Sequence, residues 1–547
     1  MRHDTKAWGY LRFDTPSTAA LSWVTLSGGG SNSFYHGASL VLLGFNGAGS
    51  PMVPMAKVNH VTISGSAGMG ALLDSQASFQ AGSSDLTITG SGSAADPRPL
   101  GLQLRALNTL PSGVYTGNLK DEIWVDSNGY VTNSVTMHDP GVPYWIYASH
   151  DNTPTIAQID AALSPPVLTI DPGVRLRMAP ATELWIGLYG SSPAALNAVG
   201  TTAQPILFTS AADTPAAGDW VGIRFGSTTP ALNQLQHVTI EYAGSGSAYH
   251  GASVALLGGN TPGPLVPVAK VVSVAIKHSG GLGAFLDTQA AFADGSTDLT
   301  ITSSGNATDP RPVGMEFRAL GSLPSGSYTG NLKDEIWVDS DGYVTTSVTM
   351  HQVGVPYWIY AQHDNQPTIA QVNAGQPAPV LTIEAGVRLR MAPATELVVG
   401  FGQDVNTLGS PASMIAIGTA AQPIVFTSAA NVPAPGDWVG IHFGGTGGPP
   451  NQVDHASIEY AGGDPLINGF SCTPGPSQNS AVLIYSWKPG QEFITNSAIL
   501  HSSGHGILRG WVDGGPDFLP TNTFDVAGCK QTLPRQTGGC PASPPCP

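Results

Sequence analysis

Charged side chains are scarce in this 547-residue chain, at 11% of the residues. Hydrophobic residues make up 41%, which excludes an intrinsically disordered chain, because disorder requires low hydrophobicity together with high charge. The helix-forming composition and the 3.5- or 3.6-residue periodicity of a coiled coil or helical solenoid are also missing. Glycine and proline are abundant instead, at 68 and 45 residues, and they indicate a β protein with frequent turns.

Positive charge is the scarcer of the two signs. The chain has 21 Lys and Arg against 37 Asp and Glu, a net charge of −16. A negative field repels phosphate backbones and anionic lipids, so we expect no nucleic-acid partner and no polybasic membrane anchor. No apolar run approaches the length of a membrane span, so we also expect no transmembrane segment.

Cysteine is confined to the last part of the chain. An even count in a region rich in Pro and Gly predicts two disulfides, with three connectivities open. The spacing includes no C-x-x-C and no Cys/His cluster, so we predict no metal site, and nothing indicates another cofactor. Disulfides imply an oxidising location outside the cytoplasm. The cysteines are Cys472, Cys529, Cys540 and Cys546.

An internal repeat with an offset of 213 residues is the most informative feature of the sequence. Tyr115–Ser127 and Tyr328–Ser340 both read YTGNLKDEIWVDS, and GVRLRMAPATEL occurs at Gly173–Leu184 and at Gly386–Leu397. A period of this size is larger than one solenoid repeat, so each unit must contain several coils.

The repeat boundaries predict one continuous solenoid built from incomplete and complete units. The first unit starts in its middle, and the N-terminal residues MRHDTK lack the apolar segment of a signal peptide. We therefore expect part of the protein, with its signal peptide, to precede Met1. The predicted segments are an incomplete first unit (1–219), a second unit (220–437), a divergent third unit (438–525) and a Cys/Pro-rich tail (526–547).

The letters inside each unit predict short strands. Val174, Leu176 and Met178 alternate with arginines, a period of two, and similar segments are separated by Gly, Pro, Asn and Asp. The best helix candidate is the Ala-containing stretch Thr155–Leu163. Short strands with an inward apolar set, repeated along the chain, fit a β-helix in which each coil stacks on the last. The tail is placed to cover the open C-terminal strand edge.

Longer runs of the sequence resemble a known family. LTIEAGVRLRMAPATELVVG, GTAAQPIVFTSAA, PGDWVGIHFGG and VDHASIEYAGG together resemble bacterial right-handed parallel β-helix repeat proteins of the pectin-lyase-like superfamily. The pattern occurs at Leu168–Gly244 and Leu381–Gly463, and its second half at Trp8–Gly30. The resemblance implies an all-β, right-handed parallel β-helix with a disulfide-stabilised C-terminal segment. It also implies a secreted or surface-attached bacterial protein, but it implies little about a reaction.

His505 is one weak catalytic candidate. It lies between two glycines, and a G-H-G motif occurs in the related polygalacturonases, which hydrolyse with paired carboxylates. Those enzymes also use N-T-D and adjacent Asp-Asp motifs, and this chain has neither. The equivalent positions of the preceding units hold Leu282 and Met69, so an ordinary side-chain position is the favoured interpretation of His505.

Asp334 and Glu335 are further weak catalytic candidates, because Lys333 places a base beside two acids. The favoured interpretation is a surface ion pair. Asp126 and Asp339 begin DSNG and DSDG, which superficially suggest a Ca²⁺ loop but have too few spaced oxygen donors. A β-turn that joins two strands as a hairpin is the favoured interpretation there.

Two side-chain groups are candidates for ligand contact. Arg175 and Arg177 point outward and could bind an anionic sugar, but pairing with carboxylates such as Glu183 on a neighbouring coil is favoured. Aromatic faces stack on sugar rings, and a repeated aromatic platform would give avidity. Because side chains alternate along a strand, one pair in each VPYWIY segment belongs to the core. The ligand-binding candidates are Trp145, Tyr147, Trp358 and Tyr360.

The sequence favours a secreted or cell-surface structural and binding protein over an enzyme, because none of the candidates combines paired catalytic roles. Its expected partner is a polysaccharide or another cell-envelope component. The alternative is a polysaccharide lyase or glycoside hydrolase that acts in a groove on the side of the β-helix. A fragment of a larger surface protein, with the active part elsewhere, is a third interpretation.

Overall fold

The computed structural model describes most of the chain: residues 8–31, 33–44, 51–147, 153–188, 192–226, 233–259, 264–360, 366–373, 375–401, 410–444, 450–464, 479–485, 487–534 and 546–547. The chain forms two compact units. Unit 1 contains Met1–Gly259, Val266–Phe285 and Phe292–Pro310, and unit 2 contains Asn260–Leu265, Leu286–Ala291 and Arg311–Pro547. Strands β23 (Ala284–Leu286) and β24 (Ala290–Phe292) include residues of both units.

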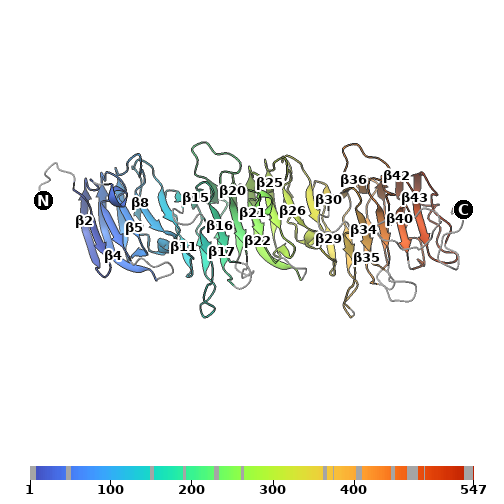
Figure 1. The fold of residues 1–547 in the computed structure, drawn as a ribbon, viewed down its shortest axis with the longest axis horizontal. Helices are drawn as coiled ribbons and strands as arrows, with labels where there is room; N and C mark the ends of the chain where they lie inside the picture. The colour runs from blue at the N-terminus through green and yellow to red at the C-terminus, as the bar shows by residue number, and fades with distance from the viewer. Residues whose placement is uncertain are drawn as a thin grey trace. The chain divides into compact units, whose positions relative to one another are not determined.

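Unit 1 is a parallel β-helix (Figure 1). One sheet follows the order β1-β3-β5-β8-β10-β12-β15-β18-β20-β17-β14-β11, and others follow β2-β4-β7-β9 and β13-β16-β19-β21. Strand β6 pairs with β4, β22 with β20, and β25 with β22. The strands are β1 (Leu11–Asp14), β2 (Ala19–Ser27), β3 (Leu40–Leu43), β4 (Val53–Ser64), β5 (Ala71–Asp74), β6 (Ala77–Phe79), β7 (Ser84–Thr89), β8 (Leu100–Gln103), β9 (Gly113–Val114), β10 (Ile123–Asp126), β11 (Val135–Met137), β12 (Tyr144–Ile146), β13 (Thr155–Ile156), β14 (Val167–Ile170), β15 (Arg175–Met178), β16 (Glu183–Ile186), β17 (Ala195–Val199), β18 (Ile206–Ser210), β19 (Gly222–Phe225), β20 (Gln234–Glu241), β21 (Val254–Leu256), β22 (Val266–Lys277) and β25 (Thr297–Thr302). Short 3₁₀ turns are η1 (Phe34–Gly37), η2 (Leu104–Thr109) and η3 (Ala248–Gly251).

Unit 2 is a parallel β-helix as well. Its sheets follow the orders β26-β28-β30-β33-β36-β39-β42-β44, β29-β32-β35-β38-β41 and β31-β34-β37-β40-β43. The strands are β26 (Val313–Glu316), β27 (Gly326–Ser327), β28 (Ile336–Asp339), β29 (Val348–Met350), β30 (Tyr357–Ile359), β31 (Thr368–Ile369), β32 (Val380–Ile383), β33 (Arg388–Met391), β34 (Glu396–Val399), β35 (Ser413–Ile417), β36 (Ile424–Ser428), β37 (Gly440–Phe443), β38 (Gln452–Asp454), β39 (Ala456–Glu459), β40 (Ser480–Tyr485), β41 (Ile494–Thr495), β42 (Ala498–Ser502), β43 (His505–Gly510) and β44 (Thr523–Val526). The 3₁₀ turn is η4 (Phe317–Ser322).

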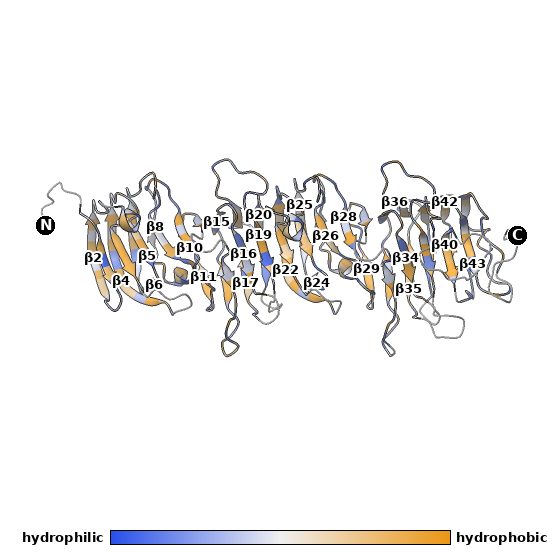
Figure 2. Cartoon of the chain, in the orientation of Figure 1, coloured by the Kyte–Doolittle hydropathy of each residue, from blue (hydrophilic) through white to orange (hydrophobic). Residues whose placement is uncertain are grey.

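The core follows the predicted period of two. In β15, Leu176 and Met178 are buried while the arginines between them lie outside, and β33 repeats this pattern. Apolar residues colour strands such as β4 and β40 largely orange in Figure 2. The expected all-β parallel β-helix is confirmed in each unit.

Several coils turn a corner through residues in the left-handed region. Trp23, His60 and Asp85 have φ values of 56°, 51° and 52°, and each lies inside one of the paired strands β2, β4 and β7. A left-handed residue lets a strand bend while its ladder continues on both sides. The corners stack in register, so the Trp23 indole lies 3.9 Å from the His60 ring, centroid to centroid.

Two local predictions are wrong. Thr155 and Ile156 of the predicted helix form β13, which pairs with β16, and no α-helix occurs in the described part of the chain. The predicted hairpin at Asp126 is a coil corner: β10 pairs in parallel with β8 and β12, and Val131 forms a parallel bridge to Ile156. Pairing with the preceding and following coils leaves the strand no antiparallel partner.

The C-terminal segment carries the expected covalent link. Cys529 and Cys546 form a disulfide across a sequence separation of 17 residues. Cys472 and Cys540 lie outside the described residues. No helix in the described ranges has the length and the apolar character needed to cross a membrane.

Candidate functional site

Strand β12 separates its aromatic side chains between the core and the outer face. Tyr144 and Ile146 are buried inside unit 1, and the Tyr144 hydroxyl donates to the carbonyl of His138 at 2.7 Å. Trp145 and Tyr147 point outward, with Tyr147 40% exposed. The expected division of this segment into one core pair and one outer pair is confirmed.

The outward side chains form a three-layer stack. The Arg98 guanidinium carbon lies 3.3 Å from the centroid of the Trp145 ring. The Tyr147 ring is stacked on the same indole at 4.7 Å, with an interplanar angle of 16°. Contacts this close cannot share one face of the indole, so Trp145 lies between Arg98 and Tyr147. Tyr147 is therefore the outermost layer of this stack.

A buried carboxylate anchors the stack from below. Glu122 is 3% exposed, and its Oε2 accepts from Arg98 Nε and Nη2 at 3.0 and 2.9 Å. Its other oxygen accepts from Arg177, which also donates to the carbonyl of Ala211 at 2.8 Å. Burial lowers the pKa of Arg98, and the charge of Glu122 opposes that shift. Two fixed arginines thus hold the carboxylate, and one of them supports Trp145.

The predicted partner of the outward arginines needs correction. Arg177 pairs with Glu122, whereas Glu183 forms its ion pair with Arg224 at 2.9 Å. Glu122 also differs from the expected surface acid, because it is buried. The sequence places Glu122 and Arg177 far apart, and only the lengths of the intervening coils bring them together.

Unit 2 contains the same stack. Arg311 lies 3.4 Å from the Trp358 centroid, and the Tyr360 ring stacks on Trp358 at 4.7 Å and 11°. Tyr360 is 41% exposed. Glu335, one of the weak catalytic candidates, is the anchor: it is 3% exposed and pairs with Arg311 at 3.1 Å and with Arg390. Its contacts are those of a buried structural carboxylate.

The other weak catalytic candidates also make structural contacts. Asp334 accepts from the backbone N–H groups of Gly330 and Asn331 at 3.1 and 2.8 Å, which closes the turn before β28. His505 begins β43, is 7% exposed, and accepts at Nδ1 from the backbone N–H of Cys529 at 2.9 Å. His505 therefore helps to hold the segment that carries the disulfide.

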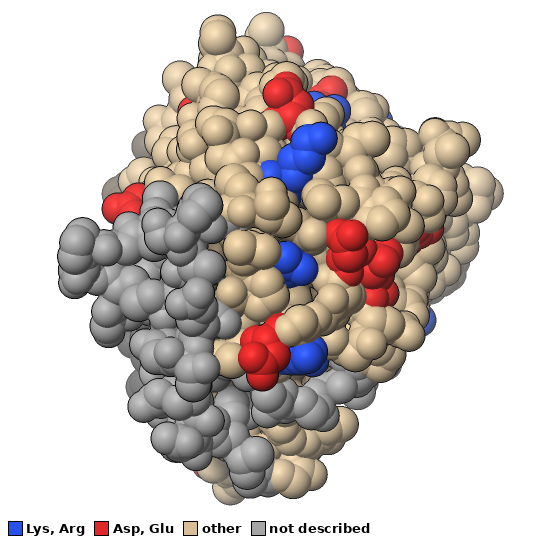
Figure 3. Space-filling view, turned by 90° about the vertical axis from the view of Figure 1, so that its right-hand side faces the viewer, with Lys and Arg blue, Asp and Glu red and all other residues tan. Residues whose placement is uncertain are grey.

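Charge is mixed rather than segregated on the outer surface that Figure 3 shows. Lys and Arg side chains lie beside Asp and Glu side chains there, and other residues separate these groups. Among the described residues, no group of three or more His, Cys, Asp and Glu side chains could hold a metal ion.

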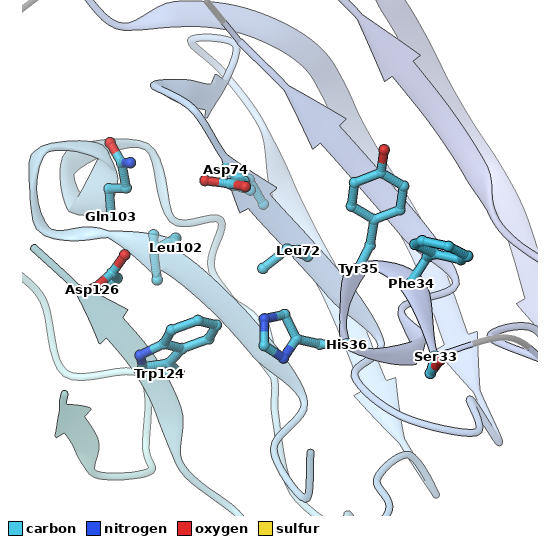
Figure 4. A pocket seen from close by; sticks show the side chains of 11 residues that line it. Ser33, Phe34, Tyr35, His36, Leu72, Asp74, Leu102, Gln103, Trp124 and Asp126 are labelled. Atoms are coloured by element: carbon cyan, nitrogen blue, oxygen red, sulfur yellow. The ribbon is translucent and has the colours of Figure 1, made fainter. Parts of the chain in front are cut away.

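Unit 1 also contains a cavity of about 460 Å³ that the sequence did not reveal. Asp74, Gln103 and Asp126 line one side, and Figure 4 shows Trp124 and His36 across from them. Gln103 and Asp126 are register partners in β8 and β10. Asp74 stands at the matching position of β5, since Ala71 pairs with Leu100 and each polar residue lies three positions further on.

The apolar wall depends on one close approach. Trp124 pairs with Gly101 of the neighbouring strand, where an added Cβ would lie 2.7 Å from Trp124 Cε3. The missing side chain lets the indole extend across β8 to pack with Leu72, in the same cluster as Trp145. The cavity and the Trp145 stack are thus parts of one outer face of unit 1.

Turn η1 supplies the remaining wall. Tyr35 and His36 have φ values of 51° and 55°, an uncommon conformation for non-glycine residues. His36 is held by Asp96, with Nδ1 and Oδ1 2.5 Å apart, and its ring lies 5.0 Å from that of Trp124. Of the cavity residues, the sequence had pointed only to Asp126, and for another role.

Comparisons with known proteins do not assign the chain. No protein-family model, no curated protein and no solved structure matches it.

Proposed function

We propose that this protein is a secreted or cell-surface β-helix that binds polysaccharide. The observation that carries the proposal is the exposed tyrosine ring on a fixed Arg–Trp stack, present as Tyr147 in unit 1 and Tyr360 in unit 2. A flat aromatic face is suited to the C–H surface of a sugar ring, and its hydroxyl can bond to the rim.

The stack supports binding because it is fixed before a ligand arrives. Arg98 and Trp145 restrict Tyr147, so little side-chain entropy remains to be lost on binding. Two such platforms in one chain would act together on a polymer that reaches both, because the second contact becomes intramolecular.

The proposed location rests on the disulfide and on the sequence resemblance. A link such as Cys529–Cys546 persists in oxidising compartments and is rare in the cytoplasm. The resemblance to pectin-lyase-like β-helix repeat proteins supports a bacterial surface or secreted protein at the level of the fold, from which an activity does not follow.

An enzyme that acts on polysaccharide is the second candidate. Asp74 and Asp126 line the same cavity as Trp124, and carboxylate pairs perform acid and base roles in glycoside hydrolysis. Released reducing ends or unsaturated uronate absorbance, lost in Asp126→Asn, would favour this candidate over binding alone.

The binding proposal is tested with the double variant Tyr147→Ala/Tyr360→Ala. We expect its retention in affinity electrophoresis on soluble polysaccharides to fall about tenfold or more, since each aromatic contact contributes about 0.5–1.5 kcal/mol beyond area burial. The control is Tyr130→Ala/Tyr343→Ala, a duplicated pair of exposed tyrosines outside the stacks. Equal retention of both double variants, or no retention of the parent protein on any polysaccharide, would contradict the proposal.

A further inference from the structure

We infer that the cavity of unit 1 is a subsite for a sugar residue that carries no carboxylate. The inference rests on the proposed polysaccharide binding and adds the class of sugar. Three features of the cavity carry it: a buried amide donor without a partner, two carboxylates beside it, and an aromatic wall opposite.

Gln103 supplies the donor. Its side chain is 2% exposed, its Oε1 accepts from Arg105 at 3.5 Å, and its Nε2 has no hydrogen-bond partner. Exchanging the amide atoms would turn N–H groups towards the arginine, so the orientation with Nε2 away from Arg105 is the favourable one. A buried donor without a partner costs about 1–3 kcal/mol, which a bound hydroxyl oxygen would offset.

Asp74 and Asp126 supply acceptors on either side of that donor. The three residues occupy matching positions on β5, β8 and β10, so their side chains form one polar row in Figure 4. Sugar hydroxyls both donate and accept, which matches an amide donor between two carboxylates. A uronate would bring a third negative charge into the same row and would be repelled.

Trp124 and His36 form the wall across from the polar row (Figure 4). A site with one apolar face and a few convergent polar groups is typical of ligand pockets, and a volume of about 460 Å³ lies within their usual range of about 300–1,000 Å³. Trp124 Nε1 also donates to the carbonyl of Tyr147 at 2.8 Å. The subsite is therefore joined directly to the stack, so one glycan chain can contact both.

Unit 2 offers a natural comparison at the repeated positions. Glu316 stands 213 residues after Gln103, pairs in register with Asp339, and accepts from the backbone N–H of Asp341 at 3.1 Å. This position therefore holds a carboxylate instead of an amide donor. A parallel β-helix coil thus accommodates Glu there, which makes Gln103→Glu a substitution that the fold tolerates.

The test titrates the full chain with neutral oligosaccharides (gluco-, manno- and galacto-oligomers) and with oligogalacturonate, followed by calorimetry. We expect at least one neutral series to bind and oligogalacturonate to bind at least tenfold more weakly. Gln103→Glu and Gln103→Leu should each weaken neutral binding about tenfold or more, while the control Glu316→Gln leaves it unchanged. Asp74→Asn/Asp126→Asn should reduce the discrimination against oligogalacturonate.

The outcomes separate the subsite from the proposed function. Full neutral affinity in both Gln103 variants, with binding lost in Tyr147→Ala/Tyr360→Ala, overturns the subsite and leaves polysaccharide binding intact. Preference of the parent protein for oligogalacturonate overturns the sugar class. If no glycan of the panel binds, both the subsite and the proposed function are rejected. Unchanged thermal unfolding of Gln103→Leu assigns its loss of affinity to the missing donor.

Discussion

At the scale of single residues, a buried glutamate determines how an exposed aromatic surface is held. Glu122 lies beneath the Trp145 stack and neutralises two arginines, one of which covers a face of the indole. Charged groups can remain buried only when they are paired and hydrogen-bonded. The exposed Tyr147 ring thus depends on a carboxylate that a ligand never meets.

Replacement of this carboxylate should strongly destabilise unit 1. Glu122→Gln leaves two arginines without a counter-charge, and we expect a loss of about 3–5 kcal/mol in the free energy of unfolding, measured by urea titration. Glu335→Gln should have a similar effect in unit 2. The control is Asp213→Asn, since Asp213 is an exposed partner of Lys120 and Arg177 and should contribute less than about 1 kcal/mol. Comparable losses from Glu122→Gln and Asp213→Asn would refute this account.

Residue-level prediction from the sequence succeeded where neighbours along the chain decide the outcome. The alternation in VPYWIY correctly separated Tyr144 from Trp145, because strand geometry sends adjacent side chains to opposite faces. The partner of Arg177 was predicted wrongly, because an ion pair between coils depends on how many residues each intervening coil contains. That number follows from the turns and cannot be read from one strand.

At the scale of elements, the turn after β10 shows what local chemistry leaves open. Asp126-Ser127-Asn128-Gly129 has the composition of a hairpin turn, and Gly129 has the positive φ, 75°, that such turns use. The same residues equally suit a coil corner, and the choice depends on which strand lies beside β10. Parallel neighbours on both sides exclude the hairpin.

A second element-level feature predicts a pH dependence in unit 2. Glu384 follows β32 and accepts from the backbone N–H of Gln352 at 2.8 Å and from His351 Nδ1 at 2.9 Å, both just after β29. Burial alone would raise its pKa, but these bonds outweigh that effect, and the pKa lies below its usual value of 4.5. The ionised carboxylate therefore stabilises the fold above that value, and this contribution disappears as the pH falls through the lowered folded pKa.

The measurement compares thermal unfolding of the parent protein and of Glu384→Gln between pH 7 and pH 3. We expect the parent to be more stable by a constant margin near neutral pH, because Glu384 is then ionised in both the folded and the unfolded state. The margin should narrow below about pH 4.5, where the unfolded carboxyl takes up its proton first. A margin that stays the same down to pH 3 would show that these two bonds do not link the ends of β29 and β32 energetically.

At the scale of the whole molecule, the repeat predicted far more than the single residues did. The duplicated letters pair in the same register in both copies: Ile123 with Tyr144, and Ile336 with Tyr357. The cavity was missed because its polar row comes from Asp74, Gln103 and Asp126, which follow no constant spacing along the chain. Their alignment exists only after strands from coils of different length have paired.

The disulfide should matter most for the C-terminal end. Closing the loop between Cys529 and Cys546, a separation of 17 residues, removes chain entropy from the unfolded state, typically about 3 kcal/mol for a loop of this size. The double variant Cys529→Ser/Cys546→Ser should therefore be cleaved faster by protease in the segment after β44. Its strands in unit 1 should resist cleavage as before, which serves as the internal control. Equal cleavage of the C-terminal segment in both proteins would show that this link is dispensable.

The shared register of the two copies has a consequence for inheritance. A block of 213 residues carries both partners of pairs such as Ile123 with Tyr144, so its gain or loss adds or removes complete coils. Recombination between nearly identical copies is therefore a simple route to longer or shorter variants with intact strand pairing. Copy number, rather than substitution, then becomes the variable that sets how many tyrosine platforms a lineage displays.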